Sequence, residues 1–253
     1  LDGPNEGLLC VKGKFAFNFV NHEDRLKTPL IKRNGLFEEA TWDEALSLIV
    51  DKINSVKDEF GSEAFGGLSS AKCTNEENYL MQKFMRAVIG TNNVDPCARL
   101  CHASTVTGLA KTLGSGAMTN SISEVKNNDT VFVIGSNTTE THPVIGSMIL
   151  SAKRKGAKII VADPREIELA KYADVYLQIE PGSNVALVNA MCNVIYHENL
   201  YDKEYINERT EGFTEFIEVI KDYYPEIAAH VCGVSASGIK KAARIYASGN
   251  KAA

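Results

Sequence analysis

Three short apolar segments, separated by helical patterns, restrict the possible folds of this chain more than any other feature. The apolar segments are Val131–Ile134, Lys158–Ala162 and Val175–Ile179, and short continuous apolar runs are typical of buried parallel strands. Helical patterns lie between them at Pro143–Lys155 and Glu166–Tyr172. This alternation predicts a doubly wound, mostly parallel, Rossmann-like α/β fold, whose ligand sites lie at the carboxyl ends of the strands. Later helices are expected over Asn184–His197, Lys203–Thr210 and Ser237–Ala247.

The first half of the chain predicts part of a second α/β domain, preceded by a small β segment at Lys14–Val20. Asn34-Gly35 within Ile31–Phe37 predicts a hairpin, because this dipeptide suits a two-residue turn with positive φ. Thr41 and Glu44 form a capping box at the start of a helix that should end near Gly61. We also expect a buried strand at Ala64–Leu68, a helix at Asn75–Ile89 closed by Gly90, and a set of core side chains: Trp42, Tyr79, Leu80, Phe84 and Val88.

Small and polar residues directly follow each of the three predicted parallel strands. The three loops are Gly135–Glu140, Asp163–Arg165 and Glu180–Asn184, and His142 lies close behind the first of them. Glycine allows the backbone to approach a phosphate, a carboxylate can accept hydrogen bonds from ribose or a purine, and arginine can pair with phosphate. Ordinary strand–helix loops favour the same residues, so both interpretations stand. The absence of a Gly-x-Gly-x-x-Gly pattern makes a plain NAD site less favoured.

Cys101 and His102 stand next to each other just before a predicted helix, Ala103–Leu113, which ends at Gly114. Backbone N–H groups and the helix dipole favour a thiolate at such a position. A thiolate beside an imidazole can be a soft metal ligand or a nucleophile with its own proton carrier. A buried free cysteine beside a chance histidine is the alternative interpretation.

Composition excludes several classes of function. The formal net charge of −5 argues against a nucleic-acid partner. No apolar run reaches the roughly 20 residues of a transmembrane helix. Six scattered cysteines without disulfide-framework spacing favour a reducing compartment, so we expect a cytoplasmic location. Leu1 stands in place of an initiator Met, and we expect the chain to be a fragment of a longer protein.

Several short motifs occur in an order that resembles one known family. They are Leu9–Phe15, Gly90–Asp95, Ala98–His102, Val133–Asn137, Ala162–Arg165 and Pro181–Asn184. The series resembles the catalytic (alpha) subunit of molybdenum- or tungsten-dependent formate dehydrogenases, in the molybdopterin oxidoreductase family. The resemblance covers essentially the whole chain.

The resemblance implies a ligand for the three loops, a molybdopterin guanine dinucleotide, with two bound per metal ion. Its guanosine and phosphates would be held by Asn137, Glu140, Asp163, Arg165, Gly182 and Asn184. Cys101 would bind Mo or W, and His102 would accept the substrate proton or orient formate. His102 also favours formate dehydrogenases over nitrate reductases, which usually carry another residue there.

The resemblance also implies an iron–sulfur cluster. Cys10 would be the last of four [4Fe–4S] ligands, with the first three upstream of Leu1, and Lys12 would assist electron passage between cluster and pterin. A surface lysine is the alternative for Lys12. The implied domains are the end of a cluster domain (1–20), part of a second α/β domain (21–95) and a Rossmann-like molybdopterin-dinucleotide-binding domain (96–253).

The implied reaction is the reversible two-electron oxidation of formate to CO2, with electrons leaving toward electron-transfer or hydrogenase-type partner subunits. The family's arginine that clamps formate would lie beyond Ala253, so we expect this polypeptide alone to be inactive. Two alternatives stay open. One is another molybdopterin oxidoreductase, such as a nitrate reductase, and the other is a non-catalytic electron-transfer scaffold subunit.

Overall fold

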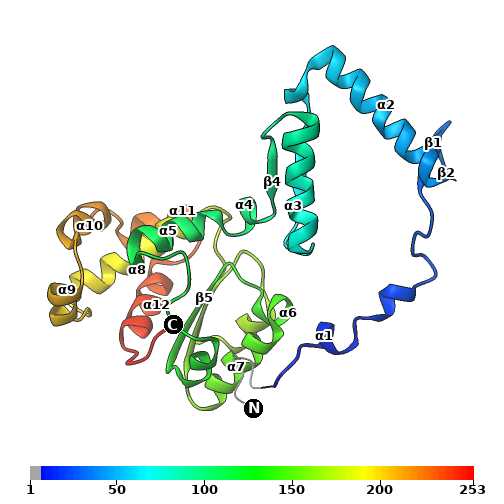
Figure 1. Ribbon diagram of the computed structural model, residues 1–253. Helices are drawn as coiled ribbons and strands as arrows, with labels where there is room; N and C mark the ends of the chain where they lie inside the picture. Colours follow the sequence, from blue (N-terminus) through cyan, green and yellow to red (C-terminus); the bar gives the residue numbers. More distant parts are fainter. Residues whose placement is uncertain (1–6) are drawn as a thin grey trace. The chain divides into compact units, whose positions relative to one another are not determined.

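A computed structural model describes residues 7–253, and the chain divides into two compact units. The sheet unit contains Asn120–Ala253 together with the N-terminal segment that ends at Phe17. The helical unit is Asn18–Thr119. Figure 1 traces the elements of both.

The sheet unit is built on three parallel strands in the order β5-β6-β7 (Figure 1). These are β5 (Thr130–Ile134), β6 (Lys158–Ala162) and β7 (Val175–Leu177). Val131 pairs with Ile159, and Ile160 pairs with Val175. The three predicted strands and their parallel arrangement are therefore confirmed.

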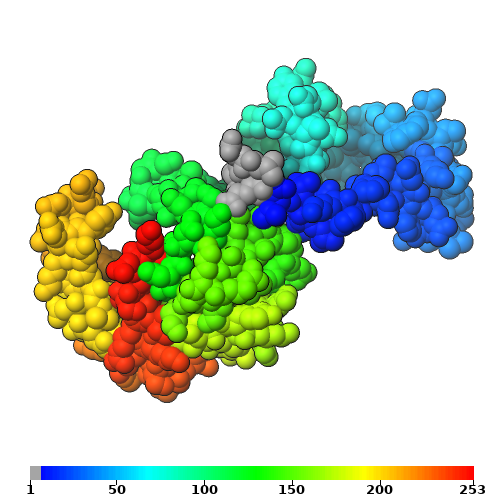
Figure 2. All heavy atoms as spheres, turned by 90° about the horizontal axis from the view of Figure 1, so that it is seen from below, coloured from blue at the N-terminus to red at the C-terminus, as the bar shows by residue number. Residues whose placement is uncertain are grey.

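The last residues of the chain extend this sheet on the other side of β5. Ala252 forms a parallel bridge to Thr130, and the N–H of Phe132 donates to the carbonyl of Ala253 at 2.7 Å. In the space-filling view the C-terminal residues, in red, lie against green residues from the middle of the chain (Figure 2). Because β6 and the C-terminal residues flank β5 on opposite sides, the strand order reverses at β5, which is the topological switch point of such a sheet.

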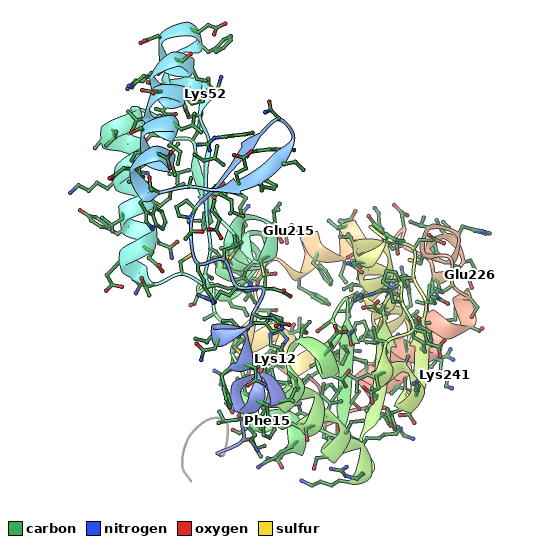
Figure 3. The ribbon with its side chains drawn as sticks, turned by 90° about the vertical axis from the view of Figure 1, so that its right-hand side faces the viewer. Lys12, Phe15, Lys52, Glu215, Glu226 and Lys241 are labelled. Carbon is green, nitrogen blue, oxygen red and sulfur yellow. The ribbon has the colours of Figure 1, made fainter. Side chains whose placement is uncertain are left out.

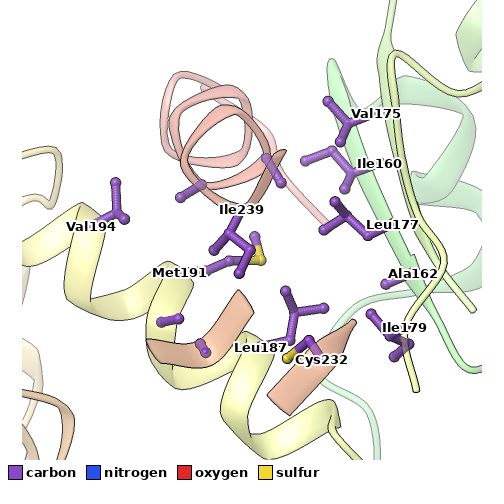
Figure 4. Close-up of a cluster of buried hydrophobic side chains, with 14 residues drawn as sticks. Ile160, Ala162, Val175, Leu177, Ile179, Leu187, Met191, Val194, Cys232 and Ile239 are labelled. Carbon is purple, nitrogen blue, oxygen red and sulfur yellow. The ribbon is translucent and has the colours of Figure 1, made fainter. Parts of the chain in front are cut away.

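Apolar side chains alternate between the two faces of the sheet, and each face has its own core. Ile159 and Val161 of β6 belong to one core and Ile160 and Ala162 to the other, and all four are fully buried. In Figure 4 Leu187 and Ile239 pack from neighbouring helices onto the second face. This two-sided burial confirms the doubly wound arrangement.

Helices cover both faces. On the first face lie η4 (Ile122–Asn127), α7 (Pro143–Arg154) and η5 (Glu168–Tyr172), and short α6 (Thr138–Thr141) precedes α7. On the second lie α8 (Asn184–His197), α11 (Pro225–Cys232) and α12 (Ala236–Ala247). The unit also contains α1 (Val11–Phe15), α9 (Lys203–Arg209) and α10 (Phe213–Ile220). The helices α10 and α11 were not predicted from the sequence.

Asp174, just before β7, joins two elements of the sheet unit. Its carboxylate accepts hydrogen bonds from Lys153 at 2.6 Å, from Lys158 at 3.1 Å and from the backbone N–H of Ile159 at 2.9 Å. Burial alone would raise the pKa of Asp174, but these three bonds outweigh it and lower the pKa to about 2. The ionised carboxylate therefore stabilises the folded state.

We expect Asp174→Asn to destabilise this chain by about 2 kcal/mol at neutral pH, since each pKa unit corresponds to about 1.4 kcal/mol. A depressed pKa stabilises the fold above the ordinary value of 3.8, and the effect is lost as pH falls toward about 2. Urea unfolding followed by circular dichroism should show the two proteins converging over that range. Glu208→Gln, at an exposed position on α9, is the matched control. A constant difference down to pH 2 would contradict the prediction.

The helical unit begins with η1 (Asn18–Asn21) and the predicted hairpin, β1 (Leu30–Arg33) and β2 (Leu36–Glu39), whose turn places Asn34 at φ 51° and Gly35 at φ 88°. Thr41 and Glu44 form the predicted capping box of α2 (Trp42–Phe60), which ends at Gly61. Two short strands, β3 (Gly67–Ser69) and β4 (Val94–Pro96), pair in parallel. The remaining elements are η2 (Ser62–Ala64), α3 (Asn75–Lys83), the π-helix η3 (Phe84–Ile89), α4 (Ala98–Cys101) and α5 (Ala103–Leu113).

Four local predictions were wrong. Residues Lys14–Val20 form no strand, because α1 (Val11–Phe15) and η1 occupy this stretch. The buried strand expected at Ala64–Leu68 is replaced by the shorter β3 (Gly67–Ser69), and its Leu68 is 85% exposed. Trp42 is exposed rather than in a core. In the predicted helix Asn75–Ile89, the expected inward residues are exposed: Tyr79, Leu80, Phe84 and Val88.

The inward face of that helix is set by Met85 and Ile89, which are buried. Gly67 of β3 has no side chain, and a Cβ there would lie 2.8 Å from Met81 and 2.9 Å from Met85. The side of the helix that bears the methionines therefore packs on β3, and the aromatic side faces outward. No helix of residues 7–253 is long and apolar enough to cross a lipid bilayer.

Candidate dinucleotide-binding site

The three polar loops all leave the same edge of the sheet, because β5, β6 and β7 are parallel neighbours. Gly135 follows β5 with φ 58°, and its N–H donates to the carbonyl of Ala162 at the end of β6. Gly182 of the third loop has φ 87°. No atom lies within 4 Å of the place where a Cβ would stand on either glycine. A ligand could therefore approach the backbone closely at both positions.

The first loop brings three of the predicted site residues together. The amide of Asn137 donates to the carboxylate of Glu140, and the backbone N–H of Glu140 donates to the carbonyl of Asn137 at 3.1 Å. Lys12 of α1 donates its ammonium to the carbonyl of Glu140 at 3.4 Å, and Figure 3 labels Lys12 on this helix. The N-terminal segment is thus attached to the loop that follows β5.

Asp163 is the most deeply placed polar group of the edge, at 3% exposed. One carboxylate oxygen, Oδ1, accepts the backbone N–H of Arg165 at 2.9 Å and lies 3.8 Å from the guanidinium of Arg165. The other oxygen, Oδ2, has no hydrogen-bond donor among the residues described. The Arg165 side chain is 72% exposed. The loop therefore offers a ligand the unpaired Oδ2 of Asp163 as a hydrogen-bond acceptor and the exposed guanidinium of Arg165 as a cation.

The third loop leads directly into α8. Asn184 is the first residue of this 14-residue helix, and no acidic residue stands in its first turn. The hydroxyl of Ser183, at the N-cap, donates to the carbonyl of Glu180 at 2.7 Å and caps no N–H of the helix. A helix N-terminus of this kind is suited to bind an anion such as phosphate.

The last residue of α11 and the turn that follows it hold the third loop through hydrogen bonds and close packing. The N–H of Glu180 donates to the carbonyl of Cys232 at 2.9 Å, and the buried thiol of Cys232 donates to the carbonyl of Ser183 at 3.7 Å. Burial raises the pKa of the Cys232 thiol, which keeps the donating proton in place. Gly233, at φ 68°, leaves room for Glu180, since a Cβ would lie 3.0 Å from the Glu180 side chain.

A crevice of about 370 Å³ opens at the switch point, beside β5. Its walls are largely apolar, and its polar side chains are Ser136, Thr138 and His142. Open α/β sheets bind ligands in such a crevice. The sequence predicts no ligand role for His142, although it lies in the nucleotide loop. The signal that indicates its place beside the crevice is its position immediately before Pro143, the first residue of α7.

Cys10 lies at the start of α1, next to a second, apolar pocket of about 360 Å³. The backbone N–H of Gly13 lowers the pKa of the Cys10 thiol, and the charge of Lys12 acts in the same direction. Both effects favour the thiolate, the form that binds metals. Among residues 7–253, no three His, Cys, Asp or Glu side chains gather as a metal site, so other segments would have to supply the further ligands of a cluster.

Cys101 and His102 belong to the helical unit. Cys101 is the last residue of α4 and is exposed, and His102 is the N-cap residue of α5. Its backbone carbonyl accepts the N–H of Val106 at 2.9 Å, and its imidazole caps no N–H of the helix. Nearby, the thiol of Cys97 accepts the backbone N–H of Ala71 at 3.4 Å. The thiol of Cys101 is thus accessible, as a ligand to an external metal must be.

Comparison with known proteins agrees with this geometry. The family model for molybdopterin oxidoreductases matches residues 25–250. The chain belongs to the molybdopterin oxidoreductase family. It is 52% identical over 248 residues to the F420-dependent formate dehydrogenase subunit alpha of Methanocaldococcus jannaschii, and 48% identical over 256 residues to formate dehydrogenase H of Escherichia coli.

Each alignment covers 98% of this chain and 36% of the relative, so the chain spans about a third of the length of these relatives. Among solved structures, it is similar to acetylene hydratase from Pelobacter acetylenicus, with a TM-score of 0.73 and 29% sequence identity. That match covers 97% of this chain and 34% of the other. The family expected from the sequence motifs, and the α/β fold that it implies, are therefore confirmed.

Proposed function

We propose that this chain is a central part of the catalytic subunit of a cytoplasmic, molybdenum- or tungsten-dependent formate dehydrogenase. The observation that carries the proposal is the identity of about one half, over nearly the whole chain, to two proteins named as formate dehydrogenases. The division into a cluster segment (1–20), a second α/β domain (21–95) and a dinucleotide-binding domain (96–253) remains part of the proposal.

The residues at the carboxyl edge of the sheet fit a pterin guanine dinucleotide. Asp163 has a free oxygen in a nearly buried position, which suits the N–H or O–H donors of a guanosine. Arg165 is exposed and can pair with phosphate. Gly182 and the N-terminus of α8 at Asn184 offer backbone N–H groups to the same phosphates.

Asn137 and Glu140 would hold the same dinucleotide from the loop after β5. The hydrogen bond between their side chains fixes both rotamers before any ligand arrives. Glu140 keeps carboxylate lone pairs available for a ribose hydroxyl. The edge thus provides acceptors and donors from three successive loops for one extended ligand.

A Mo or W ion bound by two pterin dinucleotides would supply the two-electron redox chemistry. Oxidation of formate to CO2 also releases one proton, and we assign the imidazole of His102 to accept it. Cys101 contributes its sulfur as the soft protein ligand. Cys10 would be one ligand of a [4Fe–4S] cluster and Lys12 would lie between that cluster and the pterin, so both would serve electron transfer toward electron-transfer or hydrogenase-type partner subunits.

The full-length protein that contains this sequence tests the proposal. Purified without oxygen, it should contain Mo or W together with pterin, and it should reduce a viologen dye with formate and leave nitrate untouched. Elemental analysis and the two assays measure this directly. A nitrate-specific enzyme would favour the nitrate reductase alternative. A protein with iron and sulfide but no Mo or W would show an electron-transfer scaffold instead, and either outcome would overturn the proposal.

A further inference from the structure

His142 lies between the two pockets of the sheet unit that the cofactors would use. Its side chain lines the switch-point crevice beside β5, together with Ser136 and Thr138. It also lines the apolar pocket that contains Cys10. The crevice is part of the proposed dinucleotide site, and the apolar pocket contains Cys10, the proposed cluster ligand. His142 is therefore the titratable side chain that both pockets share.

The backbone around His142 is held firmly. His142 ends α6 and precedes Pro143, and its carbonyl accepts the N–H of Gly146 at 3.0 Å. A Cβ at Gly146 would lie 2.9 Å from the Cα of Thr139, so only glycine lets α6 pack this closely on α7. The backbone at His142 is thus held by the packing of α6 on α7.

Thr141 contacts the imidazole of His142 through its hydroxyl. This hydroxyl has one proton and lies 2.9 Å from the carbonyl of Asn137, which can only accept. The same hydroxyl oxygen lies 3.0 Å from Nδ1 of His142. When the hydroxyl donates to the carbonyl, Nδ1 donates to the hydroxyl. In that arrangement a neutral His142 carries its proton on Nδ1 and has a lone pair on Nε2.

The other polar side chains of the crevice are paired with each other. The hydroxyls of Ser136 and Thr138 lie 3.0 Å apart, and Thr138 is also 3.4 Å from the carbonyl of Ser136. His142 is exposed, and its Nε2 has no partner among the residues that the structure describes. With the proton on Nδ1, Nε2 is an acceptor for an N–H group of a ligand.

We infer that Nε2 of His142 accepts a hydrogen bond from a ring N–H of the pterin, and so makes His142 a positioning residue for the cofactor. The inference rests on the proposed function. Asp163, after β6, offers its acceptor to the guanosine end of the dinucleotide. His142, on the switch-point side of β5 and beside the Cys10 pocket, faces the end from which electrons would pass to the cluster. One dinucleotide would thus be held at its two ends by acceptors from two different strands.

Two substitutions in the full-length holoenzyme separate the two imidazole nitrogens. His142→Asn keeps a donor near Nδ1, which can still bond Thr141, but removes the acceptor at Nε2. His142→Gln places an amide oxygen near Nε2 and gives up the bond to Thr141. His230→Gln, at an exposed position on α11, is the matched control.

The measurements are pterin and metal content, the midpoint potential and line shape of the metal's electron paramagnetic resonance signal, and the kinetics with formate. For His142→Asn we expect a changed signal, a shifted potential and a roughly 10-fold lower kcat, with an unchanged KM, as for the loss of a residue behind a metal ligand. His142→Gln should stay close to wild type in all of these. Circular dichroism should show that all variants are folded.

Three outcomes would overturn the inference. If His142→Asn matches His230→Gln in signal and potential, Nε2 has no contact with the pterin. If cofactor retention falls while the signal is unchanged, His142 touches the guanosine end instead. If His142→Gln is as impaired as His142→Asn, an oxygen placed near Nε2 does not replace the imidazole, and a hydrogen bond accepted at that position is not what His142 contributes. A full-length protein without pterin would instead refute the proposed function, which keeps the two failures distinct.

Discussion

Replacing Cys101 by alanine in the full-length protein should abolish formate oxidation while leaving the fold intact. The thiol is exposed at the end of α4, so its removal opens no cavity in either core of the sheet unit. Loss of a residue that merely supports a metal ligand costs about 10- to 100-fold in activity or metal affinity. We expect loss of the ligand itself to exceed 100-fold in kcat/KM, measured as formate-dependent dye reduction.

The control for this prediction is Cys73→Ala. Cys73 is also an exposed free thiol of the helical unit, and it has no place in the proposed site. It should retain wild-type turnover, and thermal unfolding should be the same for both variants. Retained turnover in Cys101→Ala would remove this cysteine from the mechanism. Activity lost equally in Cys73→Ala would point to a general effect of thiol removal.

The second large effect concerns stability. Leu187 of α8 is fully buried among Ile160, Leu177 and Ile239, on the face of the sheet that α8 and α12 cover (Figure 4). Leu187→Ala removes this contact and leaves a cavity, which typically costs about 2–5 kcal/mol. We expect the free energy of unfolding of this chain to fall by about 3 kcal/mol, measured by urea denaturation followed by circular dichroism.

Val185 provides the comparison, because it stands two residues earlier on the same helix and is 66% exposed. Val185→Ala should change the free energy of unfolding by less than about 0.5 kcal/mol, as surface substitutions usually do. Equal effects of the two substitutions would show that α8 is not packed on the sheet in solution as it is in the structure.

The parts of the fold that depend on local chemistry could be predicted from the sequence. The capping box of Thr41 and Glu44 gave the start of α2, and the predicted bounds of α8, Asn184–His197, match the structure. The apolar runs of β5 and β6 gave two adjacent parallel strands, because a strand that is covered on both faces requires apolar residues at every position. From these strands the shared edge of the three polar loops followed directly.

Predictions that depend on what packs against a helix failed. Trp42 and Leu46 of α2 carry a helical apolar pattern, yet both are more than half exposed. Periodicity shows that a helix has an apolar side but not which segment covers it. The prediction for Asn75–Ile89 assumed α-helical spacing throughout, but Phe84–Ile89 is a π-helix. Its i+5 hydrogen bonds point these residues in directions that differ from those of an α-helix.

Only the loops of the candidate site could be predicted, and not the contacts between distant segments. The sequence indicated the loops, but the contact between Lys12 and Glu140 joins residues 128 positions apart and needs the folded chain. The contacts of Thr141 with Asn137 and with Nδ1 of His142, which bear on the tautomer of His142, are likewise visible only in the folded chain. Hydrogen-bond satisfaction is a property of three-dimensional arrangement, and it decides which polar atoms remain for a ligand.

The central place of β6 has a consequence for Asp163, the residue that follows it. Neighbours flank β6 on both sides, and its residues Ile159–Ala162 are all at 0% exposure. Segments of this kind open only when a whole domain comes apart, whereas peripheral loops fluctuate freely. The acceptor proposed for guanosine therefore directly follows a strand that is buried on both faces. A nucleotide bound there would meet a preorganised oxygen, and little ordering entropy would be lost at that contact.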